Sequence, residues 1–262
     1  MRDSFSSILD SQIQEIQIDS DSLGTFSGEI ERQGTMLDAL RAKVKLAKQN
    51  SHERFILVSE GSFGPASGIG FMAQDHELLM TYDSLKDVEI VESQISLNTN
   101  FLSQKISSES DLISFMGRIG FGSHGLILHP DSDPKGSKIY KGLTTTEGAK
   151  AAFHECLTNS KTGIVTAITD MRANFNPTRI ECIKQCAFKL AKRLNTLCPR
   201  CQSGGFGVTE SLPGLPCGLC SLPTRLVINE KYRCPFCAEV LILPRADGVT
   251  SADPSHCEWC NP

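Results

Sequence analysis

The sequence lacks long apolar runs. No stretch of its 262 residues approaches the roughly 18 consecutive apolar residues of a membrane-spanning helix. The first ten residues, MRDSFSSILD, also lack the apolar core of about 7–15 residues that marks a secretory signal. We therefore expect a protein without a membrane span, and the predicted location is the cytoplasm.

Nucleotide-binding fingerprints are missing as well. Neither glycine-rich loop of the chain, at residues 24–29 and 59–65, is a Walker A or a dinucleotide-binding motif. No internal repeat or low-complexity segment occurs in the part of the chain before the C-terminal cysteines. The chain is 40% hydrophobic and 21% charged, the composition of an ordinary globular protein. The length allows one large domain and one small one.

Charge is distributed unevenly along the chain. Residues 177–262 contain ten Lys/Arg and seven Asp/Glu, a formal +3, so the preceding part must carry −7 to give the total of −4. A basic tail beside an acidic body is a pattern found in nucleic-acid-binding proteins. The cysteines of the same tail change that interpretation.

Hydrophobic periodicity predicts alternating strands and helices. Strands are expected at residues 15–19, 54–59, 76–82, 88–97, 125–129 and 161–169. Helices are expected at residues 35–49, 111–119 and 144–156, the last opened by a capping box of Thr144 and Glu147. Such alternation is typical of an α/β layered domain.

The best-supported helix begins near residue 177. Asn176 is a favourable N-cap, and Pro177 fits the first helical position. A continuous apolar stripe follows at Ile180, Ile183, Ala187, Leu190, Leu194 and Leu197. The predicted fold class is therefore α/β: a mixed layered domain, residues 1–196, that ends in this amphipathic helix. A small cysteine-rich, zinc-ribbon-like domain, residues 197–262, follows it.

Eight of the eleven cysteines form four Cys-x-x-Cys pairs near the C-terminus. They are Cys198/Cys201, Cys217/Cys220, Cys234/Cys237 and Cys257/Cys260. Each pair folds into a tight knuckle that points both sulfurs at one metal, and two knuckles complete a tetrahedral Zn(Cys)4 site. The sequence thus predicts two structural Zn²⁺ ions in place of disulfides. It leaves the pairing open between adjacent knuckles and a central ribbon with the outer two joined.

The predicted zinc ions affect both stability and charge. The tail has few large apolar residues, so metal binding would supply much of its folding free energy. Each Zn(Cys)4 carries −2, so two of them change the tail from +3 to about −1. That charge does not favour nucleic-acid binding. The other cysteines, Cys156, Cys182 and Cys186, are interpreted as buried structural thiols, although Cys182 and Cys186 have the spacing to share a metal.

The stretch TDMRANFNPTR, residues 169–179, concentrates charge at the helix start. Arg179 lies in the first helical turn, where the macrodipole disfavours cations unless an anion binds. Arg172 and Arg179, with the first-turn amides, would converge on a phosphate or carboxylate. Asp170 is the alternative anion, closing an internal salt bridge. The candidate anion- and substrate-binding residues are Lys43, Asp170, Arg172, Asn176 and Arg179.

Carboxylates gather near the two glycine-rich loops. The second loop follows a predicted strand, which would put Glu60 at a strand end, where open α/β sheets bind ligands. A set of carboxylates can hold Mg²⁺ for phosphate chemistry. The catalytic candidates are Glu29, Glu60, Asp75 and Glu77.

Several of these motifs together resemble an uncharacterised, mainly bacterial family known as a domain of unknown function. The shared motifs are GTFSGE at 24–29, SEGSFGP at 59–65, DMRA at 170–173, NPTR at 176–179 and the four knuckles. A fainter layout likeness is to inosine-triphosphate pyrophosphatases and Maf-like proteins. That likeness implies binding of nucleoside triphosphates with Mg²⁺, with Lys43 and a late-helix arginine at the phosphates.

Two functional hypotheses follow. In the first, the chain is a zinc-stabilised binding or interaction module on an α/β domain, with a partner that the sequence does not identify. In the second, the α/β domain is a Mg²⁺-dependent phosphohydrolase that acts on a phosphate-bearing small molecule. The second requires Glu29, Glu60 and the Arg172/Arg179 pair to face one cleft. Catalysis by zinc is disfavoured, because closed all-cysteine sites leave no position for water.

Overall fold

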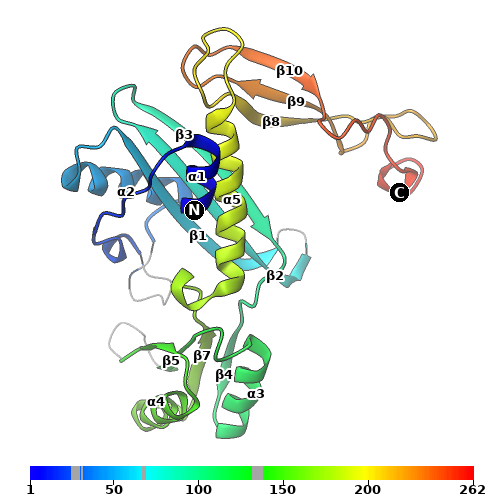
Figure 1. Ribbon diagram of the computed structural model, residues 1–262. Coiled ribbons are helices and arrows are strands. Elements are labelled where there is room, and N and C mark those ends of the chain that lie inside the picture. The colour runs from blue at the N-terminus through cyan, green and yellow to red at the C-terminus, as the bar shows by residue number, and fades with distance from the viewer. Residues whose placement is uncertain (25–29, 31, 67–68, 132–137) are drawn as a thin grey trace.

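The computed structural model describes residues 1–24, 30, 32–66, 69–131 and 138–262 (Figure 1). Its helices are α1 (Arg2–Leu9), α2 (Met36–Asn50), α3 (Glu109–Ile119), α4 (Thr146–Asn159) and α5 (Pro177–Asn195), with short 3-10 turns η1 (Asp21–Leu23), η2 (Ala173–Phe175) and η3 (Pro254–His256). Its strands are β1 (Phe55–Ala66), β2 (Ile69–Asp83), β3 (Val88–Ser96), β4 (Ser103–Ile106), β5 (Leu126–Pro130), β6 (Tyr140–Leu143), β7 (Val165–Thr169), β8 (Gly207–Pro213), β9 (Val227–Arg233) and β10 (Val240–Pro244).

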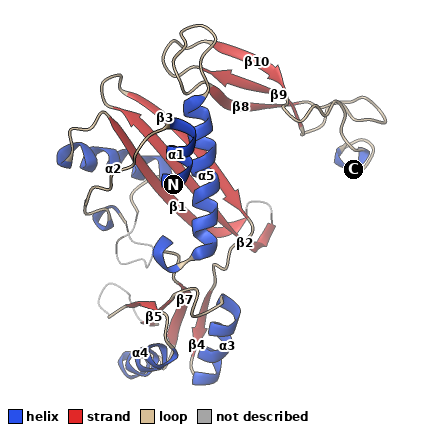
Figure 2. Ribbon diagram, in the orientation of Figure 1, coloured by secondary structure: helices blue, strands red, loops and turns tan. Residues whose placement is uncertain are grey.

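Long antiparallel strands build the first sheet, in the order β1-β2-β3. Side chains alternate between its two faces, as the pleat of a strand requires. Leu79 on β2 packs with Cys186 and Leu190 of α5, on the face that α5 crosses in Figure 2. The next residue, Met80, packs with Leu40 of α2 on the opposite face. This sheet is therefore buried on both faces, with α1 and α5 on one side and α2 on the other.

The second sheet has the order β4-β7-β5-β6 and lies near the N-terminal end of α5 (Figure 1). All its pairings are antiparallel. Helices α3 and α4 contribute Phe115 and Phe153 to a fully buried core with Leu126 and Leu128 of β5. The backbone of Gly125 donates to the carbonyl of Phe175 at 2.8 Å, which ties this sheet to the segment that leads into α5.

Most predicted elements are present, with local corrections. Residues 15–19, predicted as a strand, form no regular secondary structure. Helix α4 is capped by Thr145, whose hydroxyl accepts from the amide of Gly148, so the predicted Thr144 cap is wrong by one residue. The start of α5 is as predicted: Asn176 accepts from the Arg179 amide at 2.9 Å, and Pro177 is the first helical residue.

The third sheet, β10-β9-β8, follows α5 and is antiparallel. Its small core joins Phe206, Tyr232 and Leu241 to Cys198 and Cys234. The predicted fold class, a mixed helix-and-sheet protein with a cysteine-rich C-terminal region, is confirmed. Within the described part of the chain, no helix has the length and apolar character needed to cross a membrane.

Candidate metal centres and the buried charged cluster

The eight knuckle cysteines come together in two groups of four. Each residue offers one sulfur, and within each group these sulfurs lie within 4.8 Å of one another. The first tetrad is Cys198, Cys201, Cys234 and Cys237, and the second tetrad is Cys217, Cys220, Cys257 and Cys260. The first knuckle thus pairs with the third and the second with the fourth. Neither pairing considered from the sequence is formed.

Strand direction explains this interleaved pairing. The chain runs from the first knuckle along β8 to the second, back along β9 to the third, and forward along β10 to the fourth. Because the three strands are antiparallel neighbours, odd-numbered knuckles meet at one end of the sheet and even-numbered knuckles at the other. Gly207 at the start of β8 lies opposite Arg233 at the end of β9, which sets the first tetrad.

The sulfur spacing fits a tetrahedral ion. Neighbouring sulfurs are 3.6 Å apart for Cys198–Cys237 and for Cys201–Cys234. In the second tetrad the corresponding distances are 3.9 Å for Cys217–Cys260 and 3.6 Å for Cys220–Cys257. A tetrahedron with Zn–S bonds near 2.3 Å has S–S edges of about 3.8 Å. A disulfide would need about 2.05 Å, so these sulfurs are spaced as ligands of a metal.

Backbone amides prepare the sulfurs for the thiolate form. The amide of Leu219 donates to the sulfur of Cys217 at 3.4 Å, and that of Phe236 donates to Cys234 at the same distance. Backbone hydrogen bonds lower the pKa of Cys201 to about 6 and that of Cys217 to about 7. The pKa of Cys260 rises to about 12, first through its contact with Cys220. Four thiolates therefore need a cation in their midst.

The three remaining cysteines are buried thiols, as predicted. Burial raises the pKa of Cys156, Cys182 and Cys186 to about 12 in each case. Cys182 and Cys186 hydrogen-bond to different backbone carbonyls of the first sheet. Among the described residues, the two tetrads are the clusters of three or more His, Cys, Asp or Glu with metal-binding spacing.

The two tetrads are connected to the rest of the protein in different ways. The first follows α5 directly, and Arg193 of α5 donates to the carbonyls of Gly205 and Val91, which lie on either side of the junction. The second is held by its own loops: the amide of Gly218 donates to Ala252, and that of Ala252 to Pro216. Figure 1 shows this distal segment projecting from the β8–β10 sheet, away from α5.

A buried charged cluster lies between α5 and the first sheet. Glu77 of β2 is fully buried, and its carboxylate accepts from Arg179 Nε at 2.6 Å. Arg179 also donates to the carbonyl of Met171 at 2.7 Å. Asp75, two residues along the same face of β2, is 1% exposed, and neither of its carboxyl oxygens has a hydrogen-bond partner.

Burial sets the protonation of this cluster. It raises the pKa of Glu77 to about 7, against the lowering effect of Arg179, and it also raises the pKa of Asp75. The two carboxyl groups influence each other, so they titrate as a pair. Because Arg179 contacts Glu77 directly and Asp75 receives no donor, Asp75 is the better place for the proton.

The charges of the 169–179 stretch pair within the protein. Asp170 is fully buried and accepts from Arg172 through the backbone amide, Nε and a terminal nitrogen, the last at 2.6 Å. It also accepts from the amide of Gly142 at 2.9 Å. The internal salt bridge considered from the sequence is thus formed by Arg172, whereas Arg179 pairs with Glu77 and Asn176 caps the helix.

Glu60 lies apart from this cluster. It sits in the middle of β1, so the prediction that it ends a strand is wrong, because β1 continues to Ala66. Lys43 of α2 donates to its carboxylate at 2.5 Å, and Arg32 contacts it at 3.2 Å. Gly61, the next residue along β1, is the one that faces Arg179.

The predicted single cleft is therefore not assembled by the described residues. Gly61 pairs with Glu77 across β1 and β2, so Glu60 points to the opposite face of the sheet from Glu77 and Arg179. The α2 side holds Lys43 with Glu60, and the α5 side holds the Asp75–Glu77–Arg179 cluster. Glu29 lies outside the described residues.

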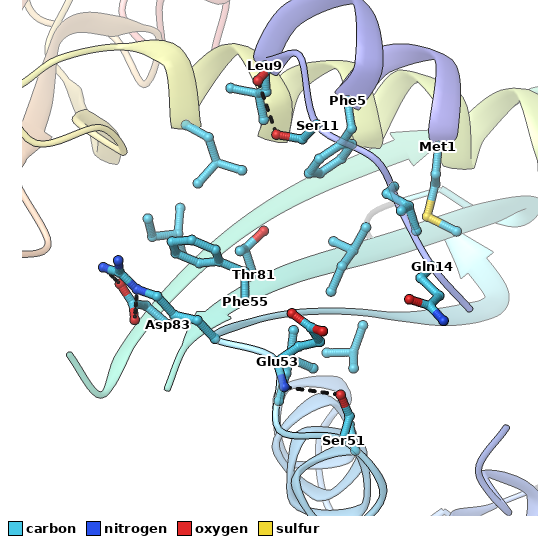
Figure 3. Close-up of a pocket in the computed structure, with 18 of the residues that line it drawn as sticks. Met1, Phe5, Leu9, Ser11, Gln14, Ser51, Glu53, Phe55, Thr81 and Asp83 are labelled. Carbon is cyan, nitrogen blue, oxygen red and sulfur yellow. Dashed lines mark hydrogen bonds and ion pairs between the residues drawn. The ribbon is translucent and has the colours of Figure 1, made fainter. Parts of the chain in front are cut away.

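A cavity that the sequence did not reveal lies between the N-terminal segment and the first sheet (Figure 3). Its volume is about 1810 Å³, and Phe5 and Leu9 of α1 face Phe55 and Thr81 across it. Phe236 of the third knuckle also lines it. Its walls come from segments far apart in the chain, and no local pattern in the sequence could have indicated it.

The chain belongs to the family described as Domain of unknown function (DUF6671), whose model matches residues 43–262. The resemblance noted from the motifs and knuckles is thus confirmed. Comparison with curated proteins and with solved structures gives no match. The fainter likeness to inosine-triphosphate pyrophosphatases and Maf-like proteins therefore receives no support.

Proposed function

We propose that this member of a family without an assigned function is a zinc-stabilised interaction protein. In this proposal residues 1–196 form the body, and residues 197–262 form a rigid binding module carried at the end of α5. The observation that carries the proposal is the pair of interleaved cysteine tetrads, whose sulfurs are spaced for tetrahedral ions.

Zinc fits these tetrads better than other common ions. Soft thiolate ligands in tetrahedral S4 geometry favour Zn²⁺, whereas Mg²⁺ takes oxygen ligands in octahedral geometry. Four cysteines fill all four positions, so the ions would be structural and would hold the loops in place. Free thiols at this density also favour a reducing compartment, consistent with the predicted cytoplasmic location.

Phosphohydrolase activity has no comparable support. The cationic candidates are engaged by carboxylates of the same chain: Lys43 by Glu60, Arg172 by Asp170, and Arg179 by Glu77. The Lys43–Glu60 pair lies on the opposite face of the first sheet from the Arg179–Glu77 pair, and each of the three pairs would have to open before phosphate could bind. The interaction hypothesis needs no such rearrangement.

Elemental analysis tests the proposal directly. We expect two zinc ions per purified, reduced chain, one lost in Cys198→Ser and the other in Cys260→Ser. Cobalt exchanged into the protein should show the absorption of two tetrahedral tetrathiolate sites. Fewer than two ions, or ions retained by both variants, would contradict the proposal.

A ligand screen tests the phosphohydrolase alternative separately. Nucleotides and phosphoesters are added with and without Mg²⁺ while thermal stability is followed. A ligand at about 100 times its Kd adds about 2.7 kcal/mol to the free energy of unfolding. We expect no Mg²⁺-dependent shift, and a shift accompanied by phosphate release would replace the interaction proposal.

A further inference from the structure

The third residue of each knuckle lies in the turn between its two cysteines. These residues are Arg200, Leu219, Phe236 and Trp259. Two of these residues, Leu219 and Trp259, belong to knuckles of the second tetrad. Both are apolar and strongly exposed, Leu219 at 72% and Trp259 at 78%. We call this pair the apolar tip.

The first tetrad shows how such a residue is used within the chain. Phe236 is only 37% exposed and lines the cavity on the body. Pro235 beside it approaches Gly205, which in turn lies against Ile90 of β3. An apolar knuckle residue of the first tetrad thus lines a cavity together with residues of the body.

The apolar tip has no such neighbour in the described structure. Trp259 and Leu219 each adjoin a cysteine of the second tetrad, so a bound ion would hold the two knuckles that carry them close together. The hydrogen bonds from Leu219 to Cys217 and from Gly218 to Ala252 hold the second knuckle rigid. A rigid, exposed tryptophan is a typical anchor of protein interfaces, because little conformational entropy is lost when it binds.

Charge indicates which partner the apolar tip fits. The surrounding segments, residues 214–226 and 249–262, carry Arg225 against Asp253 and Glu258, a formal −1. A divalent ion with four thiolates adds −2 and brings this surface to −3. The corresponding segments at the first tetrad, residues 197–206 and 230–241, carry +1 before their ion. The second tetrad therefore attracts basic partners and repels nucleic acids and anionic membranes.

A shallow hollow is lined in part by Glu258, the residue that precedes Trp259 of the apolar tip. It measures about 440 Å³ and is lined by Pro213, Gly214, Pro223, Thr224, Arg225 and Glu258. Arg225 and Glu258 form an ion pair at 2.5 Å across it, with side chains 89% and 69% exposed. So exposed a pair contributes little to stability, and a partner's lysine or arginine can replace Arg225 on Glu258.

We infer that the apolar tip, with the hollow beside it, docks a protein segment that carries both basic and apolar side chains. The inference rests on the proposed function, because the second metal ion holds Leu219 and Trp259 together. Trp259 is the anchor, Leu219 flanks it, and Glu258 receives the partner's cation.

Tryptophan fluorescence tests the inference, because Trp259 is the only tryptophan of the chain. The probes are short synthetic peptides that combine lysine with leucine, the same peptides with glutamate for lysine, and a single-stranded oligonucleotide. We expect the lysine–leucine peptides to shift the emission to shorter wavelength in a saturable way. They should bind about tenfold or more tightly than the glutamate peptides.

Matched variants separate docking from folding. Leu219→Ala, with fluorescence readout, and Trp259→Ala, with calorimetric readout, should each weaken peptide binding about tenfold or more. Both should retain two metal ions. Ile242→Ala, which removes another exposed apolar side chain of the same module, should bind like the parent chain.

The outcomes distinguish this inference from the proposed function. A chain that holds two ions but binds none of the peptides overturns the docking inference alone. Equal binding of glutamate peptides, preference for the oligonucleotide, or unchanged binding by both tip variants also overturns it. A chain that holds no metal overturns the proposed function itself.

Discussion

The two cysteine tetrads have the same ligands and nearly the same spacing, yet their surroundings differ. The first shares a core with Phe206, Tyr232 and Leu241 and is fastened to the body through Arg193. The second lies on loops at the far end of the β8–β10 sheet and exposes Leu219 and Trp259. The ligand set fixes the local fold in both places, whereas the packing around each site decides what it can contact.

The difference implies unequal consequences when each ion is lost. An ion in the first tetrad would join two knuckles and complete the buried cluster of Cys198, Phe206 and Cys234, so its loss should remove the support of the whole sheet. An ion in the second tetrad would join two distal loops that share hydrogen bonds chiefly with each other. We expect this inequality to appear when each ion, and then the contacts around it, are removed in turn.

Loss of the first ion should have the largest effect. Cys198→Ser should release the first ion and unfold the β8–β10 sheet, because structural zinc sites supply on the order of 10 kcal/mol of folding free energy. Hydrogen exchange should show loss of protection throughout β8–β10. Protection in the first sheet should remain outside Ile90 and Val91, which contact the module.

Cys260→Ser is the matched comparison. It should release only the second ion and remove protection in residues 214–226 and 249–262, with β8–β10 still protected. Equal loss of protection in the two variants would show that the tetrads form one cooperative unit.

Raising the pH should have opposite effects on the body and on the metal sites. Burial raises the pKa of both Asp75 and Glu77, that of Glu77 to about 7 from 4.5, so the folded body keeps on this pair a proton that the unfolded chain has lost between these values. Its stability therefore falls as pH rises through this window, by up to about 3 kcal/mol. The metal affinity of the tetrads changes in the opposite direction. It should fall as the pH decreases, because acid protonates the thiolates that hold the ions.

Asp75→Asn isolates the contribution of the body. The substitution keeps a neutral side chain at every pH, so the variant should gain stability relative to the parent chain as pH rises from about 5 to about 8. Metal release changes the stability of the variant and of the parent chain equally, so it cancels in the difference between their free energies of unfolding. Denaturant unfolding followed by far-ultraviolet circular dichroism measures the free energy of unfolding of both proteins. If the difference between variant and parent chain does not change with pH, Asp75 and Glu77 do not share a proton.

Breaking the contact between the first tetrad and the body should have an intermediate effect. Gly205 has a φ of +95°, and a β-carbon there would meet Ile90 Cδ1 at 2.5 Å. Gly205→Ala should therefore cost about 1–3 kcal/mol of unfolding free energy. Gly218→Ala in the second tetrad is the control, since its nearest contact would be the Ala252 carbonyl at 3.3 Å. Equal losses would mean that both tetrads are held equally tightly.

Local signals explain which features the sequence could predict. Cys-x-x-Cys spacing determines where two sulfurs of one knuckle point, and the Asn176–Pro177 cap with its apolar stripe determines α5. Both depend on residues close together in the chain, and both were predicted correctly. The capping residue of α4 was misplaced by one position, because Thr144 and Thr145 offer the same hydroxyl.

The remaining features depend on strand register, which the sequence does not display. The interleaved knuckles follow from the antiparallel order of β8, β9 and β10. The opposite orientations of Glu60 and Glu77 follow from the pairing of Gly61 with Glu77. A shift of one residue in that register would have placed both carboxylates on one face. The cavity below α1 likewise needs the full set of long-range contacts.

Of all these changes, removal of a side chain from the apolar tip should have the smallest effect on stability. It compares the two tetrads directly, because Phe236 is the equivalent residue at the first tetrad. Trp259→Ala removes a large side chain, but at 78% exposure it buries little surface on folding, so the free energy of unfolding should change by no more than about 0.5 kcal/mol. Phe236→Ala, the equivalent change at the first tetrad, should cost more because Phe236 lines the cavity on the body. Thermal unfolding with metal content measured in parallel compares the two variants. A larger loss from Trp259→Ala would mean that Trp259 stabilises its own module, and the surface of the second tetrad would then have no side chain reserved for a partner.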